Sequence, residues 1–221
     1  MIDLHTHTTF SDGVLIPAEL ARRATKAGYR AMAMTDHADH SNLDLIVSNI
    51  SRFAAETGAF LGVTVLCGVE ITHVPPPLIP QLVARARNAG AQLVVVHGET
   101  IVEPVETGTN LAAIEAGCDI LAHPGLLTPE EAELAAEHGV ALEITTRKGH
   151  SLTNGHVAVL ARRFGARLVI NNDAHEPGDL VNQERRKKVA LGAGLTLEEY
   201  LQAESNSRDI VSRILGRGRA D

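Results

Sequence analysis

The chain has 221 residues, enough for one large α/β domain or two small ones. Its formal net charge of −7 argues against a surface that binds long nucleic acids, because such surfaces usually carry a basic stripe. No apolar run reaches about 18 residues, so we expect no transmembrane helix and no membrane partner. The sequence also shows no charged leader followed by an apolar stretch, and we therefore predict a cytoplasmic location.

Apolar runs with the character of buried β-strands alternate with helical patterns along the chain. The runs end, in chain order, at residues 3–7, 35–37, 68–70, 96–99, 122–124, 143–147 and 172–175. Helices are predicted over residues 18–27, 79–89, 108–116, 129–139, 155–164 and, as a terminal helix, about 196–215.

The clearest helix boundaries are marked by proline, glycine and capping boxes. Pro17 opens the first predicted helix and Gly28 closes it. Residues 128–131 form a capping box with proline at the first helical position, and Gly139 ends that helix. Residues 196–199 form a second capping box, which predicts the start of the terminal helix.

Repeated βα units predict a parallel sheet whose strands are joined by helical crossovers. Seven such units predict a single α/β domain over residues 1–221, a barrel one unit short of the eightfold form. In barrels of this kind the functional groups lie on the loops that follow the C-terminal ends of the strands. The histidines and carboxylates of this chain recur at those positions.

Nine of these residues are candidate metal ligands. A strand directs the side chains of His5 and His7 to the same side, and Asp173 and His175 repeat this spacing. Glu70 ends a buried apolar run, where a carboxylate is costly unless it is bound, and its two oxygens can bridge two metals. The full set is His5, His7, Asp12, His37, Glu70, His97, His123, Asp173 and His175. Each alone could be structural, but nine at equivalent positions predict a polynuclear metal centre.

As an ordered set, these motifs resemble those of the PHP (polymerase and histidinol phosphatase) family. The motifs are DLHTH at 3–7, SDG at 11–13, TDH at 35–37, GVE at 68–70, HG at 97–98, HPG at 123–125 and NDAH at 172–175. The resemblance implies a distorted TIM-like (β/α)7 barrel with up to three metal ions at the C-terminal ends of the strands. It assigns to the three metals, in turn, His5, His7, Glu70 and Asp173, then Glu70, His97 and His123, then Asp12, His37 and His175.

Two cations and a histidine follow the sixth run, on the face where we expect the metals. Arg147 and Lys148 suit phosphate recognition, and arginine is the better fork for phosphate oxygens. His150 is a third candidate for contacting the substrate. The alternative is that Arg147 and Lys148 form a solvated surface pair. The basic run at 185–188 is interpreted as the solvated face of a helix.

The leading hypothesis is a metal-dependent phosphoesterase that hydrolyses a small phosphomonoester, a metabolite like histidinol phosphate. Metal-activated water is the predicted nucleophile, with Glu70 as bridging ligand and no further catalytic side chain. Because the ligands offer only nitrogen and oxygen, Zn, Mn and Fe are all candidate cofactors. Two alternatives stay open, a phosphodiesterase or exonuclease on nucleotides or DNA ends, and a non-catalytic, metal-stabilised interaction module. The acidic charge and the scarcity of aromatic residues argue against nucleic acid as a partner.

Overall fold

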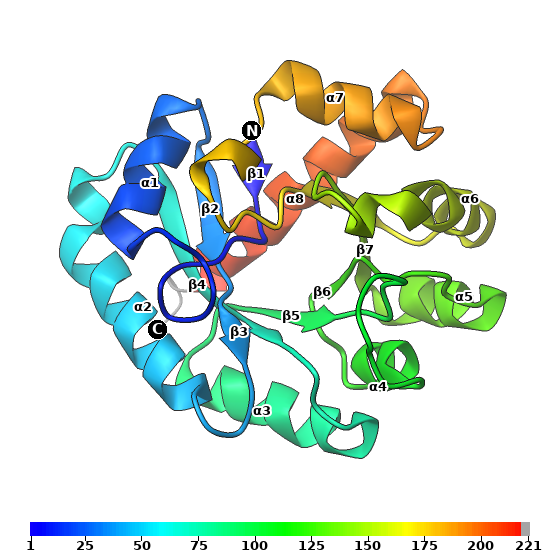
Figure 1. The fold of residues 1–221 in the computed structure, drawn as a ribbon, viewed down its shortest axis with the longest axis horizontal. Coiled ribbons are helices and arrows are strands. Elements are labelled where there is room, and N and C mark those ends of the chain that lie inside the picture. Colours follow the sequence, from blue (N-terminus) through cyan, green and yellow to red (C-terminus); the bar gives the residue numbers. More distant parts are fainter. Residues whose placement is uncertain (218–221) are drawn as a thin grey trace.

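In the computed structural model, which describes residues 1–217, parallel strands form the centre and helices surround them (Figure 1). The strands are β1 (Ile2–Asp3), β2 (Ala31–Met34), β3 (His37–Ala38), β4 (Thr64–Ile71), β5 (Leu93–His97), β6 (Ile120–Ala122), β7 (Ala141–Thr145) and β8 (Leu168–Asn171). The helices are α1 (Pro17–Lys26), α2 (Leu43–Thr57), α3 (Ile79–Ala89), α4 (Thr109–Glu115), α5 (Pro129–His138), α6 (Asn154–Phe164), α7 (Gln183–Gly192) and α8 (Leu197–Arg217). No helix in this described part of the chain combines the length and the apolar character needed to cross a membrane.

The strand order β1-β2-β4-β5-β6-β7-β8 confirms the prediction of a distorted (β/α)7 barrel. The short strand β3 does not add an eighth unit, because β2 and β3 both pair in parallel with β4, one after the other. Residues 35 and 36 separate β2 from β3. The barrel is therefore nearly closed, with seven strand positions and the predicted parallel connections.

The long helix α2 was not among the predicted helices. It begins at Leu43 without a side-chain hydrogen bond from the preceding Asn42, and no proline or capping box marks its start. Its buried face includes the β-branched residues Ile46, Val47 and Ile50, which have lower helix propensity than leucine or alanine. Packing against the sheet therefore determines this helix more than any local signal does.

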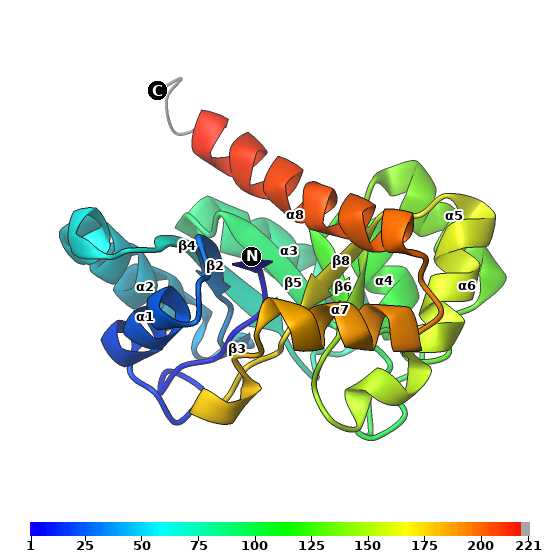
Figure 2. The same ribbon diagram turned by 90° about the horizontal axis from the view of Figure 1, so that it is seen from above.

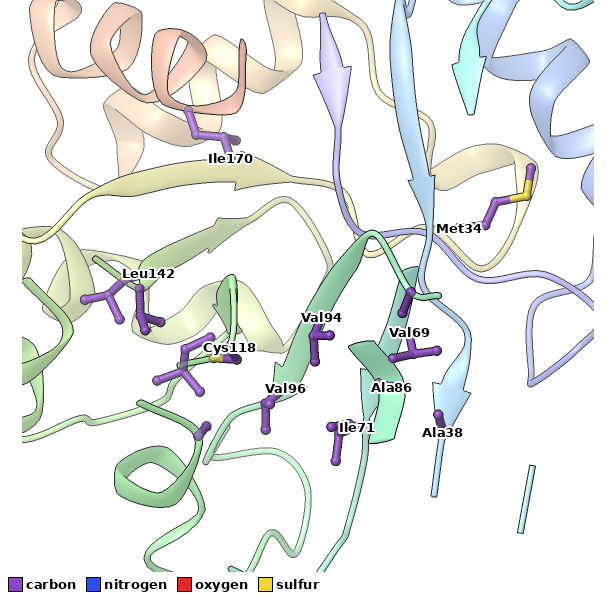
Figure 3. Packing of buried hydrophobic residues seen from close by; sticks show 14 of the residues in the cluster. Met34, Ala38, Val69, Ile71, Ala86, Val94, Val96, Cys118, Leu142 and Ile170 are labelled. Atoms are coloured by element: carbon purple, nitrogen blue, oxygen red, sulfur yellow. The ribbon is translucent and has the colours of Figure 1, made fainter. Parts of the chain in front are cut away.

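Two apolar layers hold the barrel together. The outer layer fills the space between strands and helices, and Figure 3 shows Val69, Val94 and Val96 of the strands within it together with Ala86 of α3. The inner layer lies inside the barrel and includes Ile210, Val211 and Ile214 of α8. Figure 2 shows α8 on the side of the strands opposite to β3. The terminal helix thus closes the end of the barrel away from the candidate metal ligands.

The alternation of side chains along the strands brings polar groups to the barrel interior. On β5, Leu93 and Val95 belong to the inner layer, and the same period continues to His97 at the strand end. On β4, the period that begins with Leu66 in the inner layer leads to Glu70. On these two strands the side chains that face the barrel interior are therefore apolar at first and polar at the C-terminal end.

The seam between β1 and β8 has no regular ladder. The backbones meet in one isolated parallel bridge, between Thr6 and Ala174. Below it, a side chain takes the place of backbone pairing, because the amide oxygen of Asn171 accepts a hydrogen bond from the Leu4 backbone N–H at 2.9 Å. This polar closure satisfies backbone groups that would otherwise be buried without a partner.

One residue of the basic run 185–188 corrects the interpretation of this run as a solvated face. The side chain of Arg186 is completely buried. Its guanidinium donates to Glu204 Oε1 at 2.6 Å and to the carbonyl of Ile2 at 2.8 Å, and it also contacts the carbonyl of Ile170. Arginine is needed here because its rigid fork reaches β1, β8 and α8 at the same time.

Candidate metal centre

The structure brings all nine candidate ligands together at the C-terminal ends of the strands. They form four overlapping groups whose donor atoms lie within 4.8 Å of one another. The groups are His7, Asp12, His37 and His175, then His5, His123 and Asp173, then His5, His7 and Glu70, and finally Glu70, His97 and His123. The overlap, with Glu70 in two groups, is the arrangement expected when ligands are shared between neighbouring ions.

The donor atoms are spaced like ligands of a common ion. His5 Nε2 lies 3.2 Å from Glu70 Oε1, and His175 Nε2 lies 3.1 Å from Asp12 Oδ1. Two ligands of one tetrahedral ion with bonds of about 2.0–2.1 Å are about 3.3 Å apart. The side chains therefore need only small adjustments to share an ion.

Several buried donor and acceptor atoms of the centre make no hydrogen bond. They are His5 Nε2, both ring nitrogens of His7, both carboxylate oxygens of Glu70 and His123 Nδ1. A buried polar atom without a partner costs about 1–3 kcal/mol, and a charged one more. Of these atoms, Nε2 of His5 and Nε2 of His7 face the Glu70 oxygens, and metal ions fit as their missing partners. This chemistry, imidazole nitrogen with carboxylate oxygen, suits zinc, manganese and iron.

Burial and neighbouring charges shift the pKa values of the titratable groups in the centre. Burial would raise the pKa of Glu70, but His5 and His37 hold that pKa well below its usual value. Burial opposes protonation of His37, yet the carboxylate of Glu70 raises its pKa to about 9. Burial raises the pKa of Asp173 to about 6, and burial together with His37 lowers the pKa of His7 well below its usual value. The centre is thus a compact set of coupled proton sites.

Backbone strain marks the same region. Among the described residues, the non-glycine residues with φ in the left-handed region are His73 at 52°, His123 at 26° and Asp173 at 52°. Such conformations cost about 1–3 kcal/mol each and cluster at functional sites. Gly125, two residues after His123, cannot be replaced easily, because a Cβ there would collide with the backbone of Glu99. The loops are therefore strained where two candidate ligands leave their strands.

Asp36 holds the loop that carries Asp12. Its carboxylate accepts hydrogen bonds from the backbone N–H of Thr8 at 2.7 Å, from the Thr8 hydroxyl at 2.8 Å and from the Ser11 hydroxyl at 2.8 Å. Gly13 allows the loop to turn back closely on His7. This loop therefore places the half-exposed side chain of Asp12 beside buried His7 and the partly exposed rings of His37 and His175.

Comparison with known proteins identifies the family of this chain. The PHP domain model matches residues 3–100. An uncharacterised protein of Methanocaldococcus jannaschii is 51% identical over 199 residues, which cover 89% of this chain and 91% of that protein. The chain belongs to the PHP family. A probable phosphatase of Edwardsiella ictaluri is 28% identical over 99% of this PHP chain and 95% of its own length.

The solved structures include proteins with the same fold. A histidinol phosphate phosphatase from Lactococcus lactis, crystallised with zinc, L-histidinol and phosphate, has a TM-score of 0.64 to this PHP chain. The two are 16% identical, and the match covers 88% of this chain and 94% of the other. At this sequence identity the similarity shows a shared barrel fold, and the chemistry of this chain has to be argued from its own residues.

The three candidate substrate residues of the PHP chain occupy different places. Arg147 donates to the carbonyl of Asp173 at 3.1 Å and lies 3.3 Å from Asp179 Oδ2. It lines a depression of about 330 Å³ together with exposed Lys148 and the candidate ligand His175. His150 is buried, and its ring stacks on that of His123 with centroids 4.3 Å apart. All three therefore lie near the centre, with Arg147 held against a candidate ligand.

Two carboxylates of the site were given no role on sequence grounds. Glu143 lies within the apolar strand β7, in the same interior register as Ala141, and its position in a buried run resembles that of Glu70. Glu103 lies in the loop after β5, within 3.2 to 3.5 Å of the Nε2 atoms of His73, His97 and His150. The contact with His97 lowers the pKa of Glu103 to about 2. No strand pattern points to Glu103, whereas the buried run could have identified Glu143.

Proposed function

We propose that this chain is a phosphatase that uses up to three transition metal ions to hydrolyse a small phosphomonoester. The cluster of nine nitrogen and oxygen ligands, with its orphaned buried atoms, is the observation that carries this proposal. At the coarser level, the chain is a metal-dependent phosphoesterase of the PHP family. A phosphorylated metabolite similar to histidinol phosphate is the proposed substrate, by analogy with the Lactococcus protein of the same fold.

We assign two roles to the side chains of the site, binding metal ions and binding substrate. The nine candidate ligands would hold the ions, with Glu70 shared by two of them. Bound metals would polarise the phosphoryl oxygens and lower the pKa of a water from about 15.7 towards ~7. Arg147, at the wall of the adjoining depression, supplies a planar fork that suits phosphate oxygens. The buried ring of His150 shields His123 from solvent on one side.

Elemental analysis combined with a substrate screen tests the proposal. The protein would be supplemented with Zn, Mn and Fe in turn, and its metal content would be measured alongside hydrolysis of a panel of phosphomonoesters and one phosphodiester. We expect metal binding together with preference for a phosphomonoester. Preference for the phosphodiester would favour the exonuclease alternative, and metal binding without any hydrolysis would favour a non-catalytic module.

Arg147→Ala is expected to lower kcat/KM for the phosphomonoester by about 10²-fold, equal to about 2.7 kcal/mol, because a charge-assisted contact to phosphate is lost. Steady-state kinetics would measure the effect.

Lys148→Ala is the matched control, since this exposed cation lines the same depression. We expect it to cost less than about tenfold. Because Arg147 Nε lies 3.5 Å from Asp173 Oδ2, metal content must be measured for both variants. Unchanged kinetics in Arg147→Ala would remove this residue from the substrate site.

Metal binding is expected to release protons and to strengthen as pH rises towards about 9. His37 has its pKa raised to about 9 by Glu70, against about 6.5 in an unfolded chain, so its protonated form stabilises the metal-free protein fully below pH ~6.5. That contribution is lost as pH rises through about 9, while metals no longer compete with protons. Titration calorimetry in two buffers of different ionisation enthalpy at pH 7.5 would count the protons. Binding without proton release would contradict this scheme.

A further inference from the structure

Glu143 is a fully buried carboxylate on β7 that the proposed metal sets leave out. Glu143 lies two residues after Ala141 of the inner apolar layer and therefore faces the barrel interior like Ala141. A leucine would pack at this position without the cost of burying a charge. The buried carboxylate of Glu143 therefore needs specific hydrogen-bond partners.

Those partners connect two of the proposed metal sites. His5 Nδ1 lies 2.9 Å from Glu143 Oε1, which also accepts a hydrogen bond from Asn171 Nδ2 at 2.8 Å. The other oxygen, Oε2, accepts a hydrogen bond from the backbone N–H of His123 at 3.1 Å. One carboxylate thus reaches a side chain after β1 and the backbone of the loop after β6.

Each contact has a consequence for a candidate ligand. When Nδ1 of His5 donates to Glu143, Nε2 is left unprotonated, and Nε2 is the atom that faces Glu70 and Asp173. The hydrogen bond to the His123 amide holds a residue whose φ of 26° is strained. Glu143 therefore orients one ligand through its ring and another through its backbone.

We propose that Glu143 is a positioning residue that fixes His5 and His123 for two neighbouring metal ions, so that both ions depend on this one carboxylate. The inference rests on the proposed metal centre. The third set of ligands, with Asp12, His37 and His175, makes no hydrogen bond or ion pair with Glu143. Loss of Glu143 therefore weakens two sites and spares the third.

Glu143→Gln is the central test, because the amide turns one acceptor into a donor that faces an N–H group. We expect about 10- to 100-fold weaker Zn²⁺ binding at the two sites, as for other residues that orient metal ligands. At a buffered free Zn²⁺ of about ten times the wild-type Kd, occupancy of the two sites should fall from about 90% to about 10–50%, while the third site keeps its wild-type occupancy. Adding Asp12→Asn should lower the occupancy of the third site as well.

A control separates positioning from general destabilisation. Arg186→Lys disturbs the seam at the carbonyls of Ile2 and Ile170, away from the ligands, and should lower Tm while the metal content stays at the wild-type value. Full metal content in Glu143→Gln would overturn the inference. Absence of metal from the wild-type protein would instead refute the proposed function itself.

A measurement on the wild type makes the test independent of variants that fail to fold. ¹⁵N NMR of the histidine rings in the Zn²⁺-loaded protein should show His5 protonated at Nδ1 and metal-bound at Nε2. The opposite assignment, with metal at Nδ1, would overturn the proposed role of Glu143.

Discussion

Glu70→Gln is expected to lower kcat for phosphomonoester hydrolysis by more than about 10³-fold, because the two ions that we propose for activating water and holding phosphate would lose a shared ligand. Glu70 belongs to one group with His5 and His7, and to another with His97 and His123. A neutral amide offers one acceptor oxygen in place of two, so it cannot bridge. Metal analysis by mass spectrometry and steady-state kinetics on the same samples would measure both effects.

Asp12→Asn is the matched control for Glu70→Gln. Asp12 belongs only to the group with His7, His37 and His175, and its side chain is 57% exposed. We expect this variant to lose a single ion, whereas Glu70→Gln loses two. Equal metal content in the two variants would contradict the assignment of Glu70 as the shared ligand.

Metal loading is expected to raise Tm by about 8–16 °C even when only one site is filled. An ion present at about 1,000 times its Kd adds about 4.1 kcal/mol to the free energy of unfolding. For a chain of this size, each kcal/mol shifts Tm by about 2–4 °C. The buried, orphaned atoms of His7 and Glu70 are the groups that would gain partners.

Differential scanning calorimetry with and without a chelator would measure this shift. Re-addition of Zn²⁺ or Mn²⁺ to the chelated protein should restore Tm, which shows that the chelator acts by removing metal. A Tm that does not respond to either treatment would mean that the cluster is stable without ions.

The position of the candidate ligands could be predicted because strand geometry is regular. The alternation that buries Leu93 and Val95 inside the barrel directs His97 to the same interior, and the ends of parallel strands meet at one face. Glu70 could be identified in the same way, as a carboxylate at the end of a buried run. The fold and the gathering of ligands at the strand ends follow from these patterns, whereas Asp12 lies on a loop that the hydrogen bonds of Asp36 hold.

Features that depend on tertiary contacts could not be predicted. The helix α2 has no capping signal, and its boundaries follow from packing. Arg186 stands in a run of four basic residues whose local pattern is that of a solvent-facing helix, yet it is buried because the β1–β8 seam leaves carbonyl groups to satisfy. Glu103 reaches His97 from an irregular loop, where sequence spacing carries no directional information.

The seam between β1 and β8 sets the order in which the metal centre can be assembled during synthesis. His5 and His7 leave the ribosome long before Asp173 and His175. One edge of β1 can pair early with β2, but the hydrogen bond from Arg186 to Ile2 joins residues 184 positions apart, so the contacts on its other side form only once α7 is present. The nine candidate ligands therefore come together as one set only when the β1–β8 seam has closed.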